Sequence, residues 1–286
     1  MSEDQQPPAA TPLPSAQRPK SRLGFGCVAL TAFPTVRAAC RVLDCAFEAG
    51  VTHFDTAPIY GQGYSELVLG KFLAKHRGQI TITTKFGMAP RQPPFFPPAI
   101  ALWMSALRKK SPTVQSQPSE EDSAQTDAFV CHRKITRAQV LAQFEASRRA
   151  LNTDTINIYL LHEGLPATLE PAAMDALREL KSKGLVQKLG LAANGRYYLN
   201  LQAAEIAEWD ILQYESGPAW PEHDRLLQLF PDKTHIFHSC LHAISKMDAT
   251  SAVIEILTDR LAANPSGKVL FSSKNIDHIR QTLAAL

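Results

Sequence analysis

The chain has 286 residues, 45% of them apolar, and a formal net charge of +3 at pH 7. This length and composition allow one domain with a substantial core. The mild charge, without any dense Lys/Arg stretch, argues against nucleic-acid binding. Every apolar run falls short of the ~20 residues that a membrane-spanning helix requires. We therefore expect a globular protein that binds neither nucleic acid nor a membrane, with a monomer as the default state.

Residues 1–20 are rich in Pro, Ala and Gln and lack the apolar segment of a signal peptide. They predict a disordered N-terminal tail. The cysteines are odd in number and form no CxxC pair, which argues against a disulfide framework or a structural zinc site. Free thiols and a cytoplasmic location are the resulting expectations. The five cysteines are Cys27, Cys40, Cys45, Cys131 and Cys240.

From residue 23 onward, short β-rich runs alternate eight times with segments of helical period. This alternation predicts a single α/β domain over residues 21–286, with a parallel sheet closed as a (β/α)8, or TIM, barrel. The predicted strands are Leu23–Val28, Val51–Ala57, Ile80–Phe86, Ile156–His162, Val186–Ala192, Ile211–Glu215, His235–Cys240 and Lys268–Ser272. The predicted helices cover residues 35–49, 65–76, 136–150, 171–183, 197–208, 220–229, 248–263 and 275–285.

One long insertion interrupts the alternation. Residues 88–133 are Pro-rich at first and Ser/Glu-rich later, and they contain Phe95, Phe96 and Trp103. An insertion of this length is usually functional or disordered. Two interpretations stay open: a partly mobile loop over the mouth of the barrel, or a surface insertion without substrate contact.

Reactive side chains stand near the carboxyl ends of three predicted strands. Side chains alternate between the two faces of a strand, so Thr81, Thr83 and Lys85 share one face, which we assign to the barrel interior. Asp55 lies near the end of the second strand, and His162 closes the fourth. Barrel enzymes hold their active sites at this rim. We therefore expect Asp55, Lys85 and His162 to meet there.

Tyr60, five residues after Asp55, adds a proton donor to this group. A phenol with an ordinary pKa of about 10 exchanges protons poorly at neutral pH. A buried ammonium stabilises the phenolate, a carboxylate keeps the ammonium charged, and a histidine can position a carbonyl oxygen. The set suits proton delivery to an oxygen that becomes an alkoxide. None of these groups donates electrons, so a reduction requires a cofactor that supplies hydride.

Several motifs, in this order along the chain, resemble the aldo-keto reductase family. They are Leu23–Gly26 (LGFG), Gly50–Gly61 (GVTHFDTAPIYG), Ser65–Glu66, Leu69–Gly70, Thr84–Phe86, Leu160–His162, Gly184–Gly190, Leu212–Tyr214 and Ser272–Asn275 with His278–Arg280. The resemblance runs from about Arg22 to the C-terminus. It implies an NADP(H)-dependent reduction of an aldehyde, ketone or sugar carbonyl.

The resemblance also implies a role for each site residue. Tyr60 is the general acid, Lys85 lowers its pKa, Asp55 pairs with Lys85, and His162 holds the substrate carbonyl. The implied cofactor-binding residues are Asn194, Gln213, His238, Ser239 and Leu241 towards the nicotinamide and pyrophosphate, and Ser273, Lys274, Asn275, Arg280 and Gln281, with His278 as an alternative to Gln281, towards the adenosine phosphate.

The chain departs from the family pattern mainly where the nicotinamide carboxamide is bound. The usual Ser-Asn pair is replaced by Ala192-Ala193-Asn194, so either Asn194 substitutes with a one-residue shift or this contact is weakened. Cys240 and Ser272 replace the usual Pro and Gly. An alternative function is a non-catalytic, nucleotide-binding regulatory subunit that senses redox state. A metal-dependent hydrolase is disfavoured, because the histidines form no HxH or HExxH pattern and no metal is expected.

Overall fold

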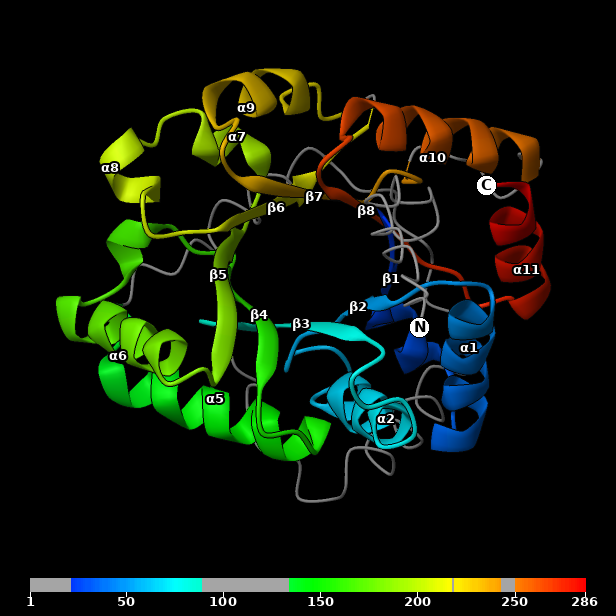
Figure 1. Cartoon of the computed structure of the whole chain (residues 1–286), viewed down its shortest axis with the longest axis horizontal. Helices are drawn as coiled ribbons and strands as arrows, with labels where there is room; N and C mark the ends of the chain where they lie inside the picture. Colours follow the sequence, from blue (N-terminus) through cyan, green and yellow to red (C-terminus); the bar gives the residue numbers. More distant parts are fainter. Residues whose placement is uncertain (1–21, 89–133, 218, 243–249) are drawn as a thin grey trace, which may run out of the picture.

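The computed structural model describes residues 22–88, 134–217, 219–242 and 250–286. Its eight parallel strands form a closed barrel in chain order, with β8 paired to β1 (Figure 1). The predicted (β/α)8 fold is confirmed. The strands are β1 (Leu23–Gly26), β2 (His53–Asp55), β3 (Thr81–Phe86), β4 (Ile156–His162), β5 (Val186–Ala192), β6 (Ile211–Glu215), β7 (Thr234–His238) and β8 (Lys268–Phe271).

Helices surround the barrel on its outside (Figure 1). The longer ones are α1 (Val36–Glu48), α2 (Tyr64–Leu73), α5 (Arg137–Leu151), α6 (Pro171–Ser182), α9 (His223–Leu229), α10 (Thr250–Ala263) and α11 (Ile276–Ala285). Shorter ones are η2 (Cys27–Ala32), η3 (Pro166–Thr168), α7 (Gly195–Tyr198) and α8 (Ala203–Ile206). Among the described helices, none is both long and apolar enough to cross a bilayer.

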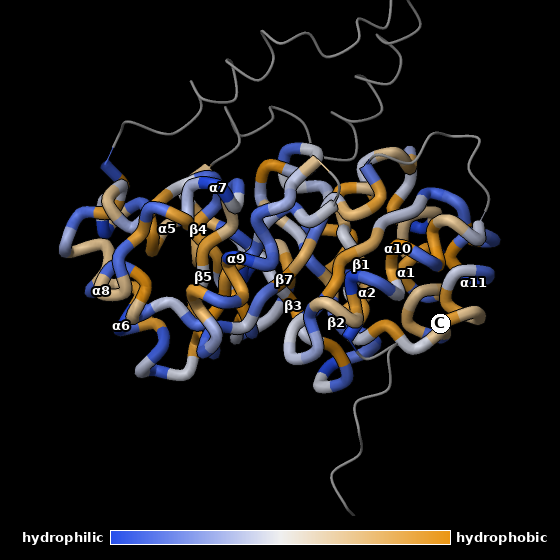
Figure 2. The backbone as a smooth tube through the Cα atoms, turned by 90° about the horizontal axis from the view of Figure 1, so that it is seen from above, coloured by the Kyte–Doolittle hydropathy of each residue, from blue (hydrophilic) through white to orange (hydrophobic). Residues whose placement is uncertain are grey.

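The apolar core has two parts, because each parallel strand buries both of its faces. The larger part lies between the strands and the surrounding helices. In Figure 2, orange, hydrophobic residues accordingly recur along the strands in the interior of the molecule, for example beside the label of β1. The smaller part fills the barrel below the site and consists of Ile158, Leu160, Ala192, Ile211, Ile236 and Leu270.

Gly190 marks how tightly the strands enclose this interior. A Cβ at this position would lie 2.6 Å from both the Ile211 carbonyl oxygen and Leu160 Cδ2. A glycine is therefore required there, because any side chain would push β5 away from its neighbours. The barrel interior is therefore a packed core, and a cavity lies above it at the carboxyl rim.

Two local predictions are wrong. The single helix predicted over 197–208 is two four-residue helices, α7 and α8. The chain breaks between them because Gln202 begins a new helix, with its backbone N–H donating to Glu205 Oε2 at 2.8 Å. Cys27 and Val28, predicted as strand, belong to η2, where the Cys27 carbonyl accepts from Ser65 Oγ.

Other element boundaries differ from the prediction by three residues or fewer, apart from the start of the predicted 248–263 helix, because residues 248 and 249 lie outside the described residues. The capping box of Thr136 and Gln139 at the start of α5 is confirmed. The predicted N-terminal tail, Cys131 and nearly all of the 88–133 insertion lie outside the described residues.

Candidate active site

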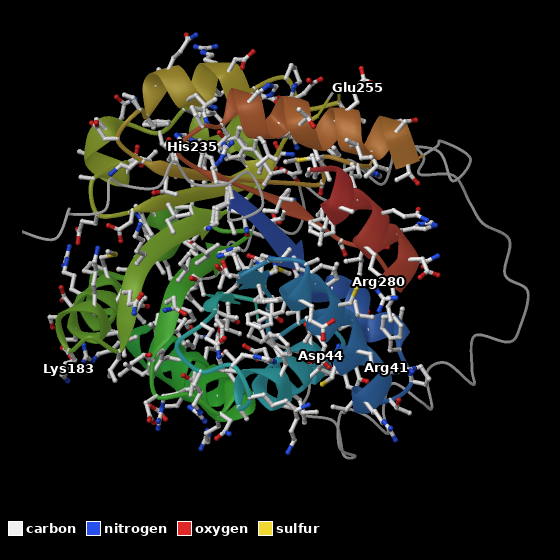
Figure 3. The ribbon with its side chains drawn as sticks, turned by 45° about the vertical axis from the view of Figure 1, so that its right-hand side comes forward. Arg41, Asp44, Lys183, His235, Glu255 and Arg280 are labelled. Atoms are coloured by element: carbon white, nitrogen blue, oxygen red, sulfur yellow. The ribbon has the colours of Figure 1, made fainter. Side chains whose placement is uncertain are left out.

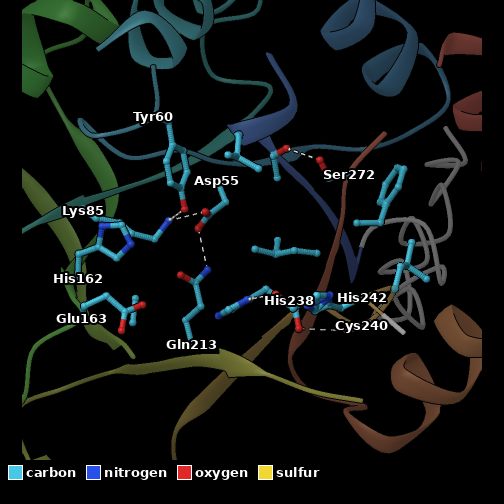
Figure 4. A pocket seen from close by; sticks show the side chains of 17 residues that line it. Asp55, Tyr60, Lys85, His162, Glu163, Gln213, His238, Cys240, His242 and Ser272 are labelled. Atoms are coloured by element: carbon cyan, nitrogen blue, oxygen red, sulfur yellow. Dashed lines mark hydrogen bonds and ion pairs between the residues drawn. The ribbon is translucent and has the colours of Figure 1, made fainter. Parts of the chain in front are cut away.

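A cavity of about 540 Å³ opens at the carboxyl rim of the barrel (Figure 4). Residues of all eight strands line it, since inward-facing residues of parallel strands converge at one rim. The lining residues are Gly26, Val28, Asp55, Tyr60, Lys85, His162, Glu163, Ala192, Gln213, His238, Ser239, Cys240, Leu241, His242, Leu270, Phe271 and Ser272.

Lys85 and Asp55 form a buried ion pair in this cavity. Lys85 Nζ donates to Asp55 Oδ1 at 2.5 Å, and the two side chains are only 3% and 5% exposed. Lys85 also donates to the carbonyl of Thr56 at 3.0 Å. Burial opposes the ammonium charge, but Asp55 and Tyr60 outweigh it and raise the pKa of Lys85. Lys85 therefore remains a cation, as predicted.

Tyr60 lies directly beside this cation. Lys85 Nζ is 3.5 Å from Tyr60 Oη and 5.2 Å from the ring centroid. Burial raises the pKa of Tyr60 above its ordinary value, and the lowering effect of Lys85 is smaller. The expected direction of the Lys85 effect holds, but the net shift is the opposite of the one predicted. The phenol is therefore protonated at neutral pH and can donate its proton.

His162 completes the group from the end of β4. Its ring lies edge-on to that of Tyr60, with 6.1 Å between the centroids. Burial and then Lys85 lower its pKa well below the ordinary value, so the imidazole is neutral. Its buried Nδ1 has no hydrogen-bond partner among the described residues. The four residues predicted from the sequence thus meet in one cavity, with a neutral histidine available to bind an incoming group.

Four of the five predicted cofactor contacts towards the nicotinamide and pyrophosphate line the same cavity, and one of them, Gln213, contacts the ion pair. Gln213 Nε2 donates to Asp55 Oδ2 at 2.7 Å. His238 Nδ1 is 2.9 Å from Ser239 Oγ, and burial and Lys85 lower the pKa of His238 to about 3. Ser239 and Leu241 follow on the same side of the cavity.

The end of β5 has no polar side chain directed into the cavity. Ala192 lines it, and the backbone N–H of Ala193 donates to Tyr198 Oη at 2.7 Å. Asn194 caps α7 by accepting from the backbone N–H of Arg196 at 3.1 Å, and it does not line the cavity. Its predicted contact with a cofactor stays a prediction.

The predicted adenosine-phosphate residues do not line the cavity; they follow Ser272, which does, along the chain and into α11. Lys274 is exposed and makes no ion pair within the described part of the chain. Asn275 caps α11 through the backbone N–H groups of Asp277 and His278. Arg280 projects from α11 beside α1, 3.8 Å from Asp277 (Figure 3). Gln281 Oε1 is 3.4 Å from Thr250 Oγ1.

Sequence reasoning missed Glu163, which lines the cavity immediately after His162. Strand alternation would direct this side chain away from the interior. However, Glu163 has a left-handed backbone, with φ of 50°, which ends the strand and changes the direction of the side chain. Only its proximity to His162 could have indicated it. Within the described ranges, no cluster of three His, Cys, Asp or Glu could hold a metal ion.

The geometry defines a (β/α)8 barrel with a buried Lys85–Asp55 ion pair beside the Tyr60 hydroxyl at its carboxyl rim. The family model described as "Aldo/keto reductase family" matches residues 22–228. The chain therefore belongs to the aldo/keto reductase family, whose members are oxidoreductases that generally bind nicotinamide cofactors.

Individual relatives agree with this family. Aldo-keto reductase AFTS1 of Alternaria alternata is 30% identical over 173 residues, which cover 59% of this chain and 44% of that protein. D-threo-aldose 1-dehydrogenase of a Pseudomonas species is 28% identical over 160 residues, 53% of this chain and 43% of the relative. The chain thus matches less than half the length of these two relatives.

Solved structures share the fold across nearly the whole chain. Aldo-keto reductase AKR11C1 from Bacillus halodurans, in its holo form, superposes with a TM-score of 0.62 at 19% identity. The superposition covers 92% of this chain and 86% of that structure. At this identity the likeness establishes the barrel alone.

Proposed function

We propose that the protein reduces the carbonyl of an aldehyde, ketone or sugar to an alcohol, using NADP(H) and Tyr60 as the general acid. One observation carries the proposal. The buried Lys85–Asp55 ion pair lies against the Tyr60 hydroxyl, and His162 faces the same cavity. Buried charge next to a protonated phenol is costly for a structural core and useful for proton transfer.

Each residue has a separate part in the proposed reaction. When bound, the cofactor supplies the hydride. Tyr60 Oη gives its proton to the carbonyl oxygen, and Lys85 stabilises the phenolate that is left. Asp55 keeps Lys85 charged and fixed in place. The neutral imidazole of His162 donates a hydrogen bond to the carbonyl oxygen and orients it.

The cavity suits a nicotinamide nucleotide at its β6–β8 side. Gln213, His238, Ser239 and Leu241 line that side, and Ser272 continues the lining towards the start of α11. Beyond it, Lys274 is exposed and has no ion pair among the described residues. Its ammonium is a suitable partner for a 2′-phosphate, which is why we propose NADP(H) rather than NAD(H). We propose that Ser273, Asn275, Arg280 and Gln281 complete this end.

We further propose that the protein acts on a small-molecule carbonyl compound as a cytoplasmic monomer. Free thiols support the location: Cys27, Cys40, Cys45 and Cys240 form no disulfide in the described part of the chain. The modest net charge supports the monomer only weakly, so sedimentation velocity of the purified protein is its direct test.

A second candidate function is a nucleotide-binding regulatory subunit without turnover. Ala192 and Ala193 favour it, because neither offers a side-chain hydrogen bond to a carboxamide. The complete group around Tyr60 argues against it, since regulation alone does not require a proton donor.

The Tyr60→Phe variant tests the proposed reaction. It removes the proton donor but keeps the ring, so we expect kcat for aldehydes to fall about 10³-fold. Nucleotide affinity, measured by fluorescence titration, should stay within about twofold. Tyr197→Phe is the matched control, since Tyr197 lies outside the cavity lining and loses the same hydroxyl.

The pH profile of the wild type provides an independent check. Because the pKa of Tyr60 is raised, the acid stays protonated and reduction should be flat from about pH 6 to 9. Oxidation of the alcohol requires the phenolate and should rise with pH over the same range. Unchanged turnover in Tyr60→Phe would remove Tyr60 from its role, and no nucleotide binding would overturn both candidate functions.

A further inference from the structure

Glu163 presents a carboxyl group to the same cavity as Tyr60 and His162 (Figure 4). Its backbone N–H donates to the Ala192 carbonyl at 2.7 Å, which anchors the residue where β4 ends against β5. Its backbone is left-handed, a conformation that is uncommon for a residue other than glycine. A substrate whose carbonyl meets Tyr60 and His162 therefore has Glu163 beside it.

The Glu163 carboxyl has no positive partner of its own. Within the described ranges it accepts no hydrogen bond and forms no ion pair. The cation in the cavity, Lys85, is already paired with Asp55 at 2.5 Å. Ala192, which also lines the cavity, has no polar side chain that could pair with the carboxyl. The carboxyl is thus half-buried without a compensating charge.

A second carboxyl reinforces this negative region. Glu215 ends β6, two residues after Gln213, and is half-buried. Its Oε2 atom is buried and has no hydrogen-bond partner among the described residues. Burial and, to a smaller extent, the charge of Glu215 raise the pKa of Glu163 to about 7, although Lys85 opposes both. Burial likewise raises the pKa of Glu215.

The remaining groups around Glu163 are neutral at pH 7. Tyr60 and Tyr198 have raised pKa values, chiefly through burial, and stay protonated. Burial keeps His162 uncharged. Near Glu215, Glu222 and Arg196 carry opposite charges, and Glu222 has the larger effect on the pKa of Glu215. With the Lys85–Asp55 pair neutral as a whole, this side of the cavity carries excess negative charge once Glu163 ionises.

We propose that Glu163, supported by Glu215, binds a cationic amino group, so that the cavity selects carbonyl compounds that also carry an amine. This inference rests on the proposed carbonyl reduction. A protonated amine supplies the positive charge that no described residue provides to Glu163. Its hydrogen bond to the carboxylate is charge-assisted. A hydroxyl group would satisfy the hydrogen bond but leave the negative charge uncompensated. The amine is therefore favoured over a sugar hydroxyl.

A series of substituted benzaldehydes tests this selection. In both the meta and para series, the substituent is dimethylaminomethyl, hydroxymethyl or isobutyl, and the first and last differ mainly in charge. At pH 8 we expect kcat/KM of the wild type to be at least tenfold higher for the amine than for the isobutyl compound. In Glu163→Gln the ratio should fall towards 1, and Glu163→Asp should restore part of it. Glu48→Gln, at an exposed position on α1, is the matched control and should keep the wild-type ratio.

Binding without turnover provides a second readout. In calorimetric titrations of N,N-dimethylbenzylamine, the affinity of the wild type should increase several-fold from pH 6 to pH 8, as Glu163 ionises while the amine stays protonated. Glu163→Gln should lose most of this increase.

Thermal unfolding gives a third readout. The pKa of the Glu163 carboxyl is higher in the folded than in the unfolded protein. The free energy of unfolding therefore decreases as the pH rises from the unfolded-state pKa to the folded-state pKa. The decrease in Tm from about pH 5 to 8 should therefore be smaller in Glu163→Gln.

The outcomes separate this inference from the proposed function. Equal kcat/KM for amine and isobutyl aldehydes, with no binding of the amine, would overturn the inference and leave carbonyl reduction standing. A preference for the hydroxymethyl compound would assign Glu163 to a neutral hydroxyl and also overturn it. Binding of the amine through Glu163 without reduction of any aldehyde would support the amine site and overturn the proposed reaction.

Discussion

The two sides of the barrel rim are built differently. On the side of β2 to β4, Asp55, Lys85 and His162 are buried and interact closely with one another and with Tyr60. On the side of β5 to β8, Ala192 has no polar side chain, and Lys274 is exposed. The first side holds its reactive groups through burial and ion pairing, whereas the second offers separate contacts along a longer surface.

Because of this difference, the two sides should tolerate different side-chain substitutions. A buried ion pair is strongly coupled, so removing one member leaves an uncompensated charge. Exposed contacts each contribute little and can be exchanged one at a time. Gln213 connects the two sides. It lies on β6 and lines the cavity there, and its side-chain amide donates a hydrogen bond to Asp55 on β2. The replacements at Ala192 and Ala193 are thus compatible with an intact proton-donating group.

Lys85→Met should break the strongly coupled side and have the largest effect. Asp55 would keep a buried carboxylate without its partner, costing ~3–5 kcal/mol of the free energy of unfolding. Turnover should fall by about 10³-fold or more, because Tyr60 loses the charge that stabilises its phenolate. Urea unfolding and steady-state kinetics measure the two effects. Lys71→Met, at an exposed position on α2, controls for the loss of a lysine. A stable, active Lys85→Met protein would refute the proposed coupling.

Lys274→Ala should affect only the cofactor side. If Lys274 binds the 2′-phosphate, the Kd for NADPH should rise about tenfold, which corresponds to the loss of one charge-assisted contact. The Kd for NADH should change by less than about twofold, and kcat at saturating NADPH should be maintained. Fluorescence titration with both nucleotides measures this, with Lys75→Ala as the surface control. Equal weakening of both nucleotides would show that Lys274 does not distinguish the 2′-phosphate.

Ala192→Ser should have the smallest effect, and this effect should be an increase in nucleotide affinity. The new hydroxyl would lie in the cavity lining, where it can hydrogen-bond a carboxamide, so nucleotide Kd should fall by about three- to tenfold. The exposed Ala172→Ser variant on α6 is the control and should leave Kd unchanged. If Ala192→Ser weakens the nucleotide instead, the β5 end does not face the carboxamide and the two sides are less independent than described.

Much of the fold was predictable because its signals are local. Strands β4, β5 and β6 were predicted with their observed bounds, since β-rich runs of five to seven residues stand between segments of helical period. The α5 capping box was also evident from Thr136 and Gln139. The break between α7 and α8 was not, because a four-residue helix has too few turns to show a helical period. Its position depends on a cap at Gln202 that competes with helix continuation.

In the candidate site, too, the features set by local sequence patterns were predictable and those set by tertiary packing were not. Sequence alone placed Asp55, Lys85 and His162 at one rim, because side chains alternate along strands and parallel strands end at a common edge. Tertiary structure alone decided that Glu163 joins them, because its left-handed backbone departs from that alternation. It also decided that Tyr60 is held protonated, since burial depends on every element packed around the ring and outweighs its one nearby cation.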